Sequence, residues 1–337
     1  MAPQFYSPYP LHIVDFIPQL PYYGDPRDDR NYFRLVTDLC GLQAVSMVKW
    51  PQMAFDPVEM FEAIRHQPRS VHRVHWELLL RAAEQQGASV AMDKSLDNVH
   101  HADELMTLFP DMLFVNVVRD PRAQVASMNR AIIHDFDTRL NAEIWLAAHR
   151  AADHVTNRYP GRVLTIRYED FLSAQQATLE TLCRFLGIDY LPQMLDVGAS
   201  QEARQISQLS ALWSSNCFPP IVANIDKFKQ QLSMDEIELI ETMTGDYLDR
   251  YGYARLTPGA TDLSPSTRAA AVARSDAGRA RAWRELEQDN FRDYVLRRCR
   301  ADYLAQLRAR PALPALQLGD ANATLSELDP AAFEVSD

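Results

Sequence analysis

The chain has 337 residues, of which 47% are hydrophobic and 23% charged, as in an ordinary globular protein with room for one large domain and an appendage. Its formal net charge of −11 argues against general nucleic-acid binding, although it is compatible with a local cationic pocket for a small anion. No apolar run approaches about 18 residues, and the N-terminal stretch lacks the basic start and apolar core of a signal peptide, so we expect neither a transmembrane helix nor a secretion signal. The cysteines have no metal-ligand spacing and are typical of reduced thiols in a cytoplasmic protein: Cys40, Cys183, Cys217 and Cys299.

Apolar runs and helical patterns alternate over the first part of the chain. Short apolar runs predict buried strands at residues 10–18, 88–95, 112–118 and 162–170. Helical spacing of apolar residues predicts helices at residues 30–41, 57–67, 71–87, 101–110, 122–132, 140–160 and 177–188, the first of them ending at Gly41. Strands alternating with helices at these lengths predict an α/β fold, in which helices flank both faces of a central parallel sheet.

The composition changes after about residue 253. We assign residues 1–254 to the α/β domain and the small, polar residues 255–275 to a linker. An arginine-rich helical extension is expected over residues 276–310, and its aromatic side chains must pack either on the core or on a second subunit. Residues 311–337 are rich in proline and acidic side chains and are expected to form a loose tail.

The stretch LFVNVVRDPRAQVASM, residues 113–128, joins a buried strand to a helix. Open parallel sheets bind ligands beyond the carboxyl ends of their strands, and Arg119 stands at such an end. Pro121 suits the first turn of the helix, and Ser127 follows on that helix, eight residues after Arg119. A guanidinium and a hydroxyl together suit a phosphate group. The alternative is that Arg119 pairs with a neighbouring carboxylate and Ser127 only packs.

This stretch resembles the 3′-phosphate-binding motif of the sulfotransferase family. Four further segments resemble family motifs in the same order along the chain: MDKSLDNVHHADELMTLFPD before the motif, then VLTIRYEDF, TLETLCRFLGI and NIDKFKQQLSMDEIELIETMTGDYLDRYGY after it. The resemblance covers about residues 10–253. It implies a P-loop-like α/β fold and the donor 3′-phosphoadenosine 5′-phosphosulfate (PAPS), whose 3′-phosphate Arg119 and Ser127 would hold.

The family's other anchor is a phosphate loop after the first strand, commonly Gly-x-Pro-(Arg/Lys)-Ser-Gly-Thr-Thr, whose backbone N–H groups cradle the 5′-phosphosulfate. The corresponding GDPRDDRN, residues 24–31, has Asp-Asp-Arg-Asn in place of Ser-Gly-Thr-Thr. Asp28 and Asp29 would cap the following helix and repel an anion. Arg27 and Arg30 would either offset this repulsion and bind the donor, or pair with the two aspartates. Three explanations stay open: the altered loop still binds PAPS, the donor or reaction has changed, or the chain is non-catalytic.

Lys94 is the first catalytic candidate. It ends a predicted strand twenty-five residues before Arg119 and matches the family's lysine that touches the bridging or sulfuryl oxygen, where it would stabilise developing charge. The alternative is a surface lysine that pairs with Asp93 or Asp97.

The general base is open. The family's histidine two residues after such a lysine is replaced by Leu96. We favour His75, because VHRVHW places it one turn after His72 and beside Trp76, where a pocket could form. The other candidates are Glu59, Glu62, His72, His100 and His101. His72 and His75 lack a third metal ligand, so we expect no metal site.

The resemblance also implies supporting roles. Glu169 or Asp170 would brace the phosphate loop or Arg119. The region around residues 213–218, which includes Trp213 and Phe218, would close over donor and acceptor. Lys227 and Lys229 would lie near the 3′-phosphate, or alternatively on a solvated helix.

Three interpretations follow. The first is a cytoplasmic sulfotransferase that moves a sulfuryl group from PAPS to a hydroxyl or amine of a small molecule, such as a specialised metabolite, without metal, nucleic acid or membrane. The second is a relative that no longer uses PAPS and either catalyses another transfer or only binds. The third is an assembly protein whose C-terminal helix is the active part. A homo-oligomer, if present, would form through that helix.

Overall fold

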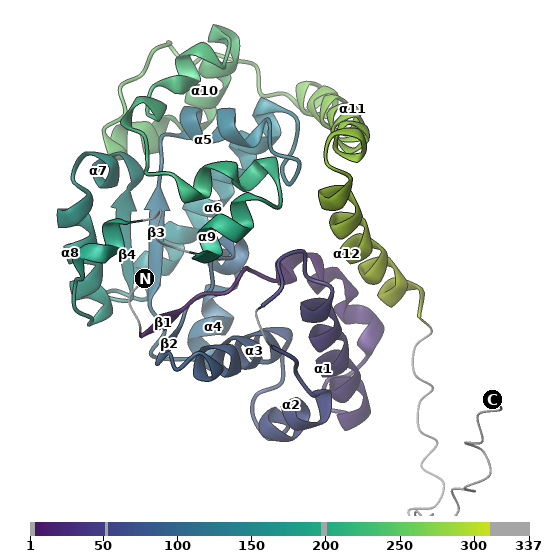
Figure 1. The fold of residues 1–337 in the computed structure, drawn as a ribbon. Helices are drawn as coiled ribbons and strands as arrows, with labels where there is room; N and C mark the ends of the chain where they lie inside the picture. Colours follow the sequence, from purple (N-terminus) through teal and green to yellow (C-terminus); the bar gives the residue numbers. More distant parts are fainter. Residues whose placement is uncertain (1–3, 51–52, 197–200, 311–337) are drawn as a thin grey trace, which may run out of the picture.

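A computed structural model describes residues 4–50, 53–196 and 201–310 (Figure 1). The strands are β1 Phe5–Tyr6, β2 Val90–Ala91, β3 Phe114–Val118 and β4 Val163–Arg167. The α-helices are α1 Asp29–Ala44, α2 Pro57–Ile64, α3 Val71–Gln85, α4 Ala102–Leu108, α5 Pro121–Met128, α6 Thr138–Arg158, α7 Tyr168–Ser173, α8 Gln175–Leu186, α9 Gln201–Ser207, α10 Met234–Tyr251, α11 Pro265–Asp289 and α12 Phe291–Ala309. The 3-10 helices are η1 Ile13–Asp15, η2 Ile17–Tyr23, η3 Leu96–His101, η4 Pro192–Leu195, η6 Ala211–Cys217, η7 Val222–Asn224 and η8 Lys227–Gln230.

The described strands pair in parallel, as the predicted α/β class requires. β1 pairs with β2 and β3 with β4, so the hydrogen bonds divide the strands into two parallel pairs. In the longer pair, Phe114 lies opposite Val163 and Val118 opposite Arg167. Helices α5 and α6 form the crossover between β3 and β4, because two parallel strands need a long connection. The carboxyl ends of β3 and β4 therefore lie side by side.

The predicted first strand at residues 10–18 is wrong. This segment forms η1 and η2, and the first strand is β1, a few residues earlier. Its apolar side chains are nevertheless buried, with Leu11 1% and Phe16 0% exposed. Prolines at 10, 18 and 21 cannot donate to a strand ladder, whereas short 3-10 turns tolerate them. An apolar run of this length indicates burial but does not distinguish a strand from tight turns.

The C-terminal helices run along one side of the molecule, from the region of α5 and α6 down to α1 (Figure 1). α11 docks on α6 and the loop before it, where Arg274 pairs with Asp137 at 2.8 Å and Arg279 pairs with Asp135 at 2.9 Å. The predicted linker is thus too long, because α11 already begins at Pro265, a favoured first helical residue that an alanine-rich run follows. The tail at 311–337 lies outside the described residues.

α12 packs on the core rather than projecting into solvent. Leu304 and Leu307 are buried, and the Tyr303 hydroxyl donates to the backbone oxygen of Asp38 at 2.8 Å. Gly41 lies under this ring, where a Cβ atom would be 2.1 Å from the Tyr303 hydroxyl. The prediction that α1 ends at Gly41 is therefore wrong: the helix continues to Ala44, and the glycine permits the close approach of α12.

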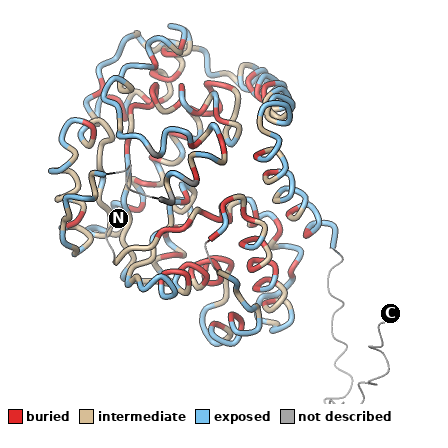
Figure 2. The backbone as a smooth tube through the Cα atoms, in the orientation of Figure 1, coloured by how far each residue is buried: buried red, intermediate tan, exposed pale blue. Residues whose placement is uncertain are grey.

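The largest core cluster joins α1, α2, α3 and α12 with η1 and η2. A second joins α5, α6, η8 and α10. Figure 2 shows buried residues collected on the facing sides of these helices. Within the described part of the chain, no helix is both long and apolar enough to cross a membrane.

Candidate functional site

Arg119 lies directly beyond β3, beside the end of β4. Its guanidinium carbon stands 5.0 Å from the ring centroid of Tyr168, the first residue after β4. The Nε atom of Arg119 is buried and has no hydrogen-bond partner, and no ion pair of Arg119 is recorded among the described residues. A buried guanidinium nitrogen without an acceptor is costly, so an anion bound here would complete its hydrogen bonding.

The acidic groups around the turn after Arg119 are already paired. Asp120 caps α5 by accepting from the backbone of Arg122, and it pairs with that guanidinium at 2.6 Å. Arg122 also reaches Glu241 at 2.5 Å, and all three side chains are buried. Glu169 accepts the Asp120 N–H at 3.0 Å, as expected of a residue that braces the turn after Arg119. Among the described residues, Arg119 therefore does not pair with a neighbouring carboxylate, contrary to the alternative given above.

Ser127 lies on α5 and is exposed. Its hydroxyl makes no hydrogen bond within the described chain and is therefore open to a ligand. Helix η8 packs against α5 through the buried Phe228, whose ring lies 4.9 Å from the Arg122 guanidinium. On η8, Lys229 pairs with Asp226 at 2.7 Å, whereas Lys227 is exposed.

The carboxyl ends of β1 and β2 also lie side by side, since the backbone N–H of Met92 donates to Tyr6 at 2.9 Å. Ser7 follows β1, and its buried hydroxyl has no hydrogen-bond partner among the residues that the structure describes. Lys94 follows β2 and is exposed. It does not pair with Asp93, because the Asp93 carboxylate accepts from Ser95 and Asn98 and contacts His75 instead.

The loop at residues 24–31 does not follow a strand, because η2 precedes it. Asp28 caps α1 by accepting the backbone N–H of Arg30 at 2.8 Å, as expected from its position at a helix start. Arg27 pairs with Asp25 at 2.6 Å. Asp29 pairs with arginines of the α2–α3 region, Arg65 at 2.8 Å and Arg69 at a closer contact. The expectation that this loop directly follows the first strand is therefore wrong. The segment that follows the first strand, β1, is instead Ser7–His12.

His75 is 0% exposed, and its Nε2 lies 3.2 Å from Asp93 Oδ2. Burial by itself would raise the pKa of Asp93, but the hydrogen bonds from His75, Asn98 and Ser95 outweigh it and lower that pKa. The pair therefore braces the turn that carries Lys94. In this conformation the imidazole has no surface on which to meet an acceptor.

His12 is a residue that sequence reasoning missed. It has φ 50°, the only positive φ of a described residue other than glycine, and lies at the end of the segment after β1. Such a conformation costs about 1–3 kcal/mol and recurs at functional sites. Burial and then Arg300 lower its pKa, while the carboxylates of Asp15, Asp93 and Asp97 act in the opposite direction. No local pattern in the sequence signals a left-handed histidine.

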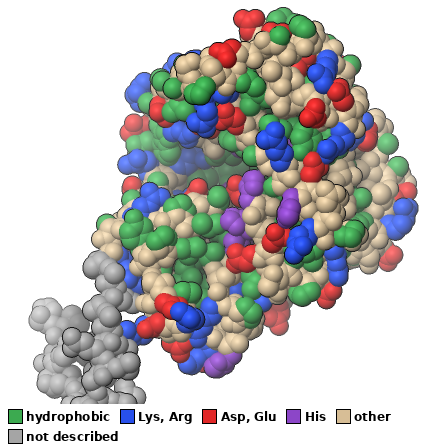
Figure 3. Space-filling view, turned by 180° about the vertical axis from the view of Figure 1, so that it is seen from behind, with side chains coloured by type: hydrophobic (Ala, Val, Ile, Leu, Met, Phe, Trp, Pro, Cys, Tyr) green, Lys and Arg blue, Asp and Glu red, His purple; other side chains and the backbone are tan. Residues whose placement is uncertain are grey.

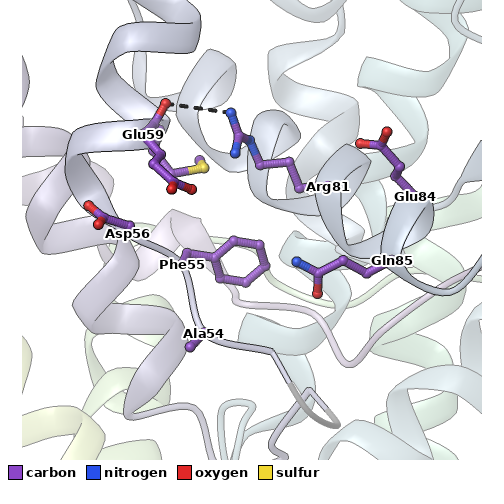
Figure 4. Close-up of a pocket in the computed structure, with 8 residues that line it drawn as sticks. Ala54, Phe55, Asp56, Glu59, Arg81, Glu84 and Gln85 are labelled. Carbon is purple, nitrogen blue, oxygen red and sulfur yellow. Dashed lines mark hydrogen bonds between the residues drawn. The ribbon is translucent and has the colours of Figure 1, made fainter.

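The remaining base candidates lie elsewhere. Glu62 pairs with Arg65 at 2.9 Å. Glu59 lines a pocket of about 170 Å³ between α2 and α3, where Arg81 donates to its backbone oxygen (Figure 4). This pocket is formed by helices rather than by strand ends. His100 is exposed, whereas His72 and His101 lie together with their ring centroids 4.6 Å apart.

The segment expected to close over the site packs on the chain after β1. Trp213 of η6 is 9% exposed and meets Tyr9 edge to face, with centroids 5.3 Å apart. Arg297 of α12 covers the same indole at 5.6 Å. Phe218, just beyond η6, is 62% exposed. One aromatic residue of this segment is therefore anchored and the other is available to a ligand.

Comparison with known proteins agrees with the motifs. A model of the sulfotransferase family matches residues 3–192, more than half of the chain. Two curated relatives, the omega-hydroxy-beta-dihydromenaquinone-9 sulfotransferases Stf3 of Mycobacterium bovis and Mycobacterium tuberculosis, are each 23% identical over 180 residues. The match covers 48% of this chain and 41% of either relative, so the chain spans less than half of their length.

Two solved structures are also similar. The sulfotransferase domain from the curacin biosynthetic pathway has a TM-score of 0.44 and 16% identity, over 59% of this chain and 73% of that domain. The sulfotransferase domain from the Synechococcus PCC 7002 olefin synthase has a TM-score of 0.41 and 18% identity, over 71% of this chain and 93% of that domain. On the family match, together with the arginine and serine that follow β3, the chain belongs to the sulfotransferase family.

Proposed function

We propose that the protein transfers a sulfuryl group from PAPS to a hydroxyl or amine of a small molecule. The observation that carries this proposal is Arg119, a strand-end guanidinium whose buried Nε has no acceptor while the neighbouring carboxylates are committed elsewhere. Arg119 and the exposed hydroxyl of Ser127 would hold the 3′-phosphate, which distinguishes PAPS from ATP-like nucleotides.

In the proposed reaction the acceptor oxygen or nitrogen forms a bond to sulfur as the bond from sulfur to the 5′-phosphate oxygen breaks. The products are the sulfated acceptor and 3′-phosphoadenosine 5′-phosphate. Lys94, exposed beyond β2, would neutralise charge on the leaving phosphate oxygen. The hydroxyl of Ser7, which follows the neighbouring β1, would be a further donor for that phosphate.

The acceptor's proton needs a base. His75 was the expected base, but its full burial against Asp93 suits it to hold the Lys94 turn instead. We assign the proton to His12, because it is only partly buried and its lowered pKa leaves a neutral imidazole at pH 7. His12→Ala is expected to lower kcat more than it raises KM for the donor, whereas a wholly structural role would reduce folded yield without that split.

Calorimetry with 3′-phosphoadenosine 5′-phosphate tests the donor assignment. We expect binding at about micromolar Kd, weakened about 10- to 100-fold in Arg119→Ala, since a hydrogen bond to a charged group contributes about 1.5–3 kcal/mol. The matched control is Arg130→Ala, which removes an exposed side chain beyond the end of α5 that donates to Gln231 at 2.8 Å. A wild-type protein that binds nothing at millimolar nucleotide would refute the assignment.

A second candidate is a family relative that does not use PAPS. Its support is the segment after β1, where Pro8 and Pro10 lack N–H groups and a 3-10 helix follows rather than a long α-helix. Such a segment offers few backbone donors for a 5′-phosphosulfate. Binding of 3′-phosphoadenosine 5′-phosphate without any transfer of labelled sulfate to a panel of alcohols and amines would favour this candidate.

A further inference from the structure

Three potential metal ligands meet beside the Lys94 turn. They are His72 of α3, His101 at the end of η3, and Glu104 of α4, and one ligand atom from each lies within 4.8 Å of the other two. The closest contact joins His72 Nδ1 and Glu104 Oε2 at 2.9 Å. Figure 3 shows histidine side chains gathered next to acidic ones on the face opposite to that of Figure 1.

His72 gives an independent sign that a ligand belongs here. Its side chain is 2% exposed; Nδ1 lies 2.9 Å from Glu104 Oε2, and Nε2 has no hydrogen-bond partner within the described chain. Almost every buried polar atom in a native protein has a partner. The imidazole of His72 therefore lies against His101 and Glu104 with its Nε2 atom buried and without a partner among the described residues.

We propose that His72, His101 and Glu104 bind one divalent transition-metal ion, with zinc as the best fit. Two imidazoles and a carboxylate suit zinc and its neighbours better than magnesium or calcium, which prefer oxygen ligands. Zinc bonds of about 2.0–2.2 Å separate tetrahedral ligands by about 3.3–3.6 Å, so small side-chain rotations would bring all three atoms to one ion. The fourth position would be left to water or another ligand, because His101 and Glu104 are only partly buried.

This site departs from the expectation of no metal, which considered His72 with His75. The structure separates those two, since His75 faces Asp93. The bound ion would link α3 to η3 and α4, and η3 begins two residues after Lys94. Metal binding should therefore stabilise the Lys94 turn. The proposal does not depend on PAPS being the donor.

The test uses the full chain, freed of metal by a chelator and kept reduced. Titration with Zn²⁺ should show one ion per chain and a raised Tm, and Co²⁺ should give the intense visible absorption of a tetrahedral site. His101→Ala and Glu104→Gln should each weaken Zn²⁺ binding by at least about 10- to 100-fold. Loss of a group that only hydrogen-bonds to a metal ligand already costs this much, and these two residues would be ligands themselves. Both side chains are only partly buried, so we expect both variants to fold, and circular dichroism checks this.

Two controls separate this site from adventitious binding. His100→Ala removes the adjacent exposed imidazole, and Cys299→Ser removes an exposed thiol. Both should keep wild-type affinity and the cobalt spectrum. The proposal is overturned if the wild type takes up no ion, or if binding survives unchanged in His101→Ala and Glu104→Gln.

Discussion

His149 should make the protein lose stability on mild acidification. It lies on α6 and is 6% exposed, with its ring 4.0 Å from that of Trp145 and 6.1 Å from that of Tyr247. Its Nδ1 is buried without a hydrogen bond. Burial lowers the pKa of His149 from 6.5 to about 4, and the carboxylate of Asp153 offsets only part of this effect. The folded protein therefore resists protonation of this ring, while the unfolded chain takes up the proton near pH 6.5.

The magnitude follows from this difference in proton uptake. Below pH 6.5 the unfolded state binds more protons, so stability falls as the pH falls, and the loss levels off near pH 4. At about 1.4 kcal/mol per pKa unit, the loss is about 1.4 kcal/mol at pH 5.5 and about 2.6 kcal/mol at pH 4.5, with a limit of about 3.4 kcal/mol.

The assay is urea unfolding of the wild type and of His149→Leu at pH 7.5, 6.5, 5.5 and 4.5. Leucine is apolar and does not titrate, and it leaves no acceptor unpaired, since the ring Nδ1 has no partner. All other ionisable groups are common to both proteins. The difference in unfolding free energy between variant and wild type should shift by the amounts above in favour of the variant. If the two proteins lose the same stability over this range, the imidazole is not buried as described.

Three further changes test other parts of the fold, each by denaturant unfolding at pH 7.5. Glu241→Gln should cost about 3 kcal/mol, because it leaves Arg122 short of a partner in a fully buried ion pair, and a loss below about 1 kcal/mol would mean that water reaches the pair. Gly278→Ala should cost about 1–3 kcal/mol, because its Cβ would lie 2.4 Å from that of Phe136; an unchanged protein would show that α11 is not docked as described. Ser233→Ala should cost about 1 kcal/mol by breaking the capping box of α10, and no change would mean that this helix end is frayed.

Predictions based on neighbouring residues succeeded where the signal is local. The run before Arg119 forms β3, and Asp28 caps α1, because a strand end and a helix cap are both decided within a few residues. The strand predicted at residues 10–18 failed, since burial alone does not select between a strand and a 3-10 turn. The break predicted at Gly41 failed as well, because the ring of Tyr303, far along the chain, explains that glycine.

Distant pairings decided the candidate site. Sequence order puts His72 beside His75, but folding brings His72 to His101 and Glu104 and buries His75 against Asp93. Spacing along α3 could not choose these partners, because His101, Glu104 and Asp93 all lie outside that helix.

The sequence by itself determined the elements around β3, the motif Arg-Asp-Pro followed by a serine, and hence the family. Only the tertiary structure decided which charged groups are still free to act. The physical reason is that a charge is neutralised by whatever group lies within a few ångströms of it, and that group can be remote in sequence, as Glu241 is from Arg122. Within the described chain, Arg119 has no ion-pair partner, because Asp120 pairs with Arg122 and Glu169 bonds to the backbone of Asp120. These pairings form only when the chain folds.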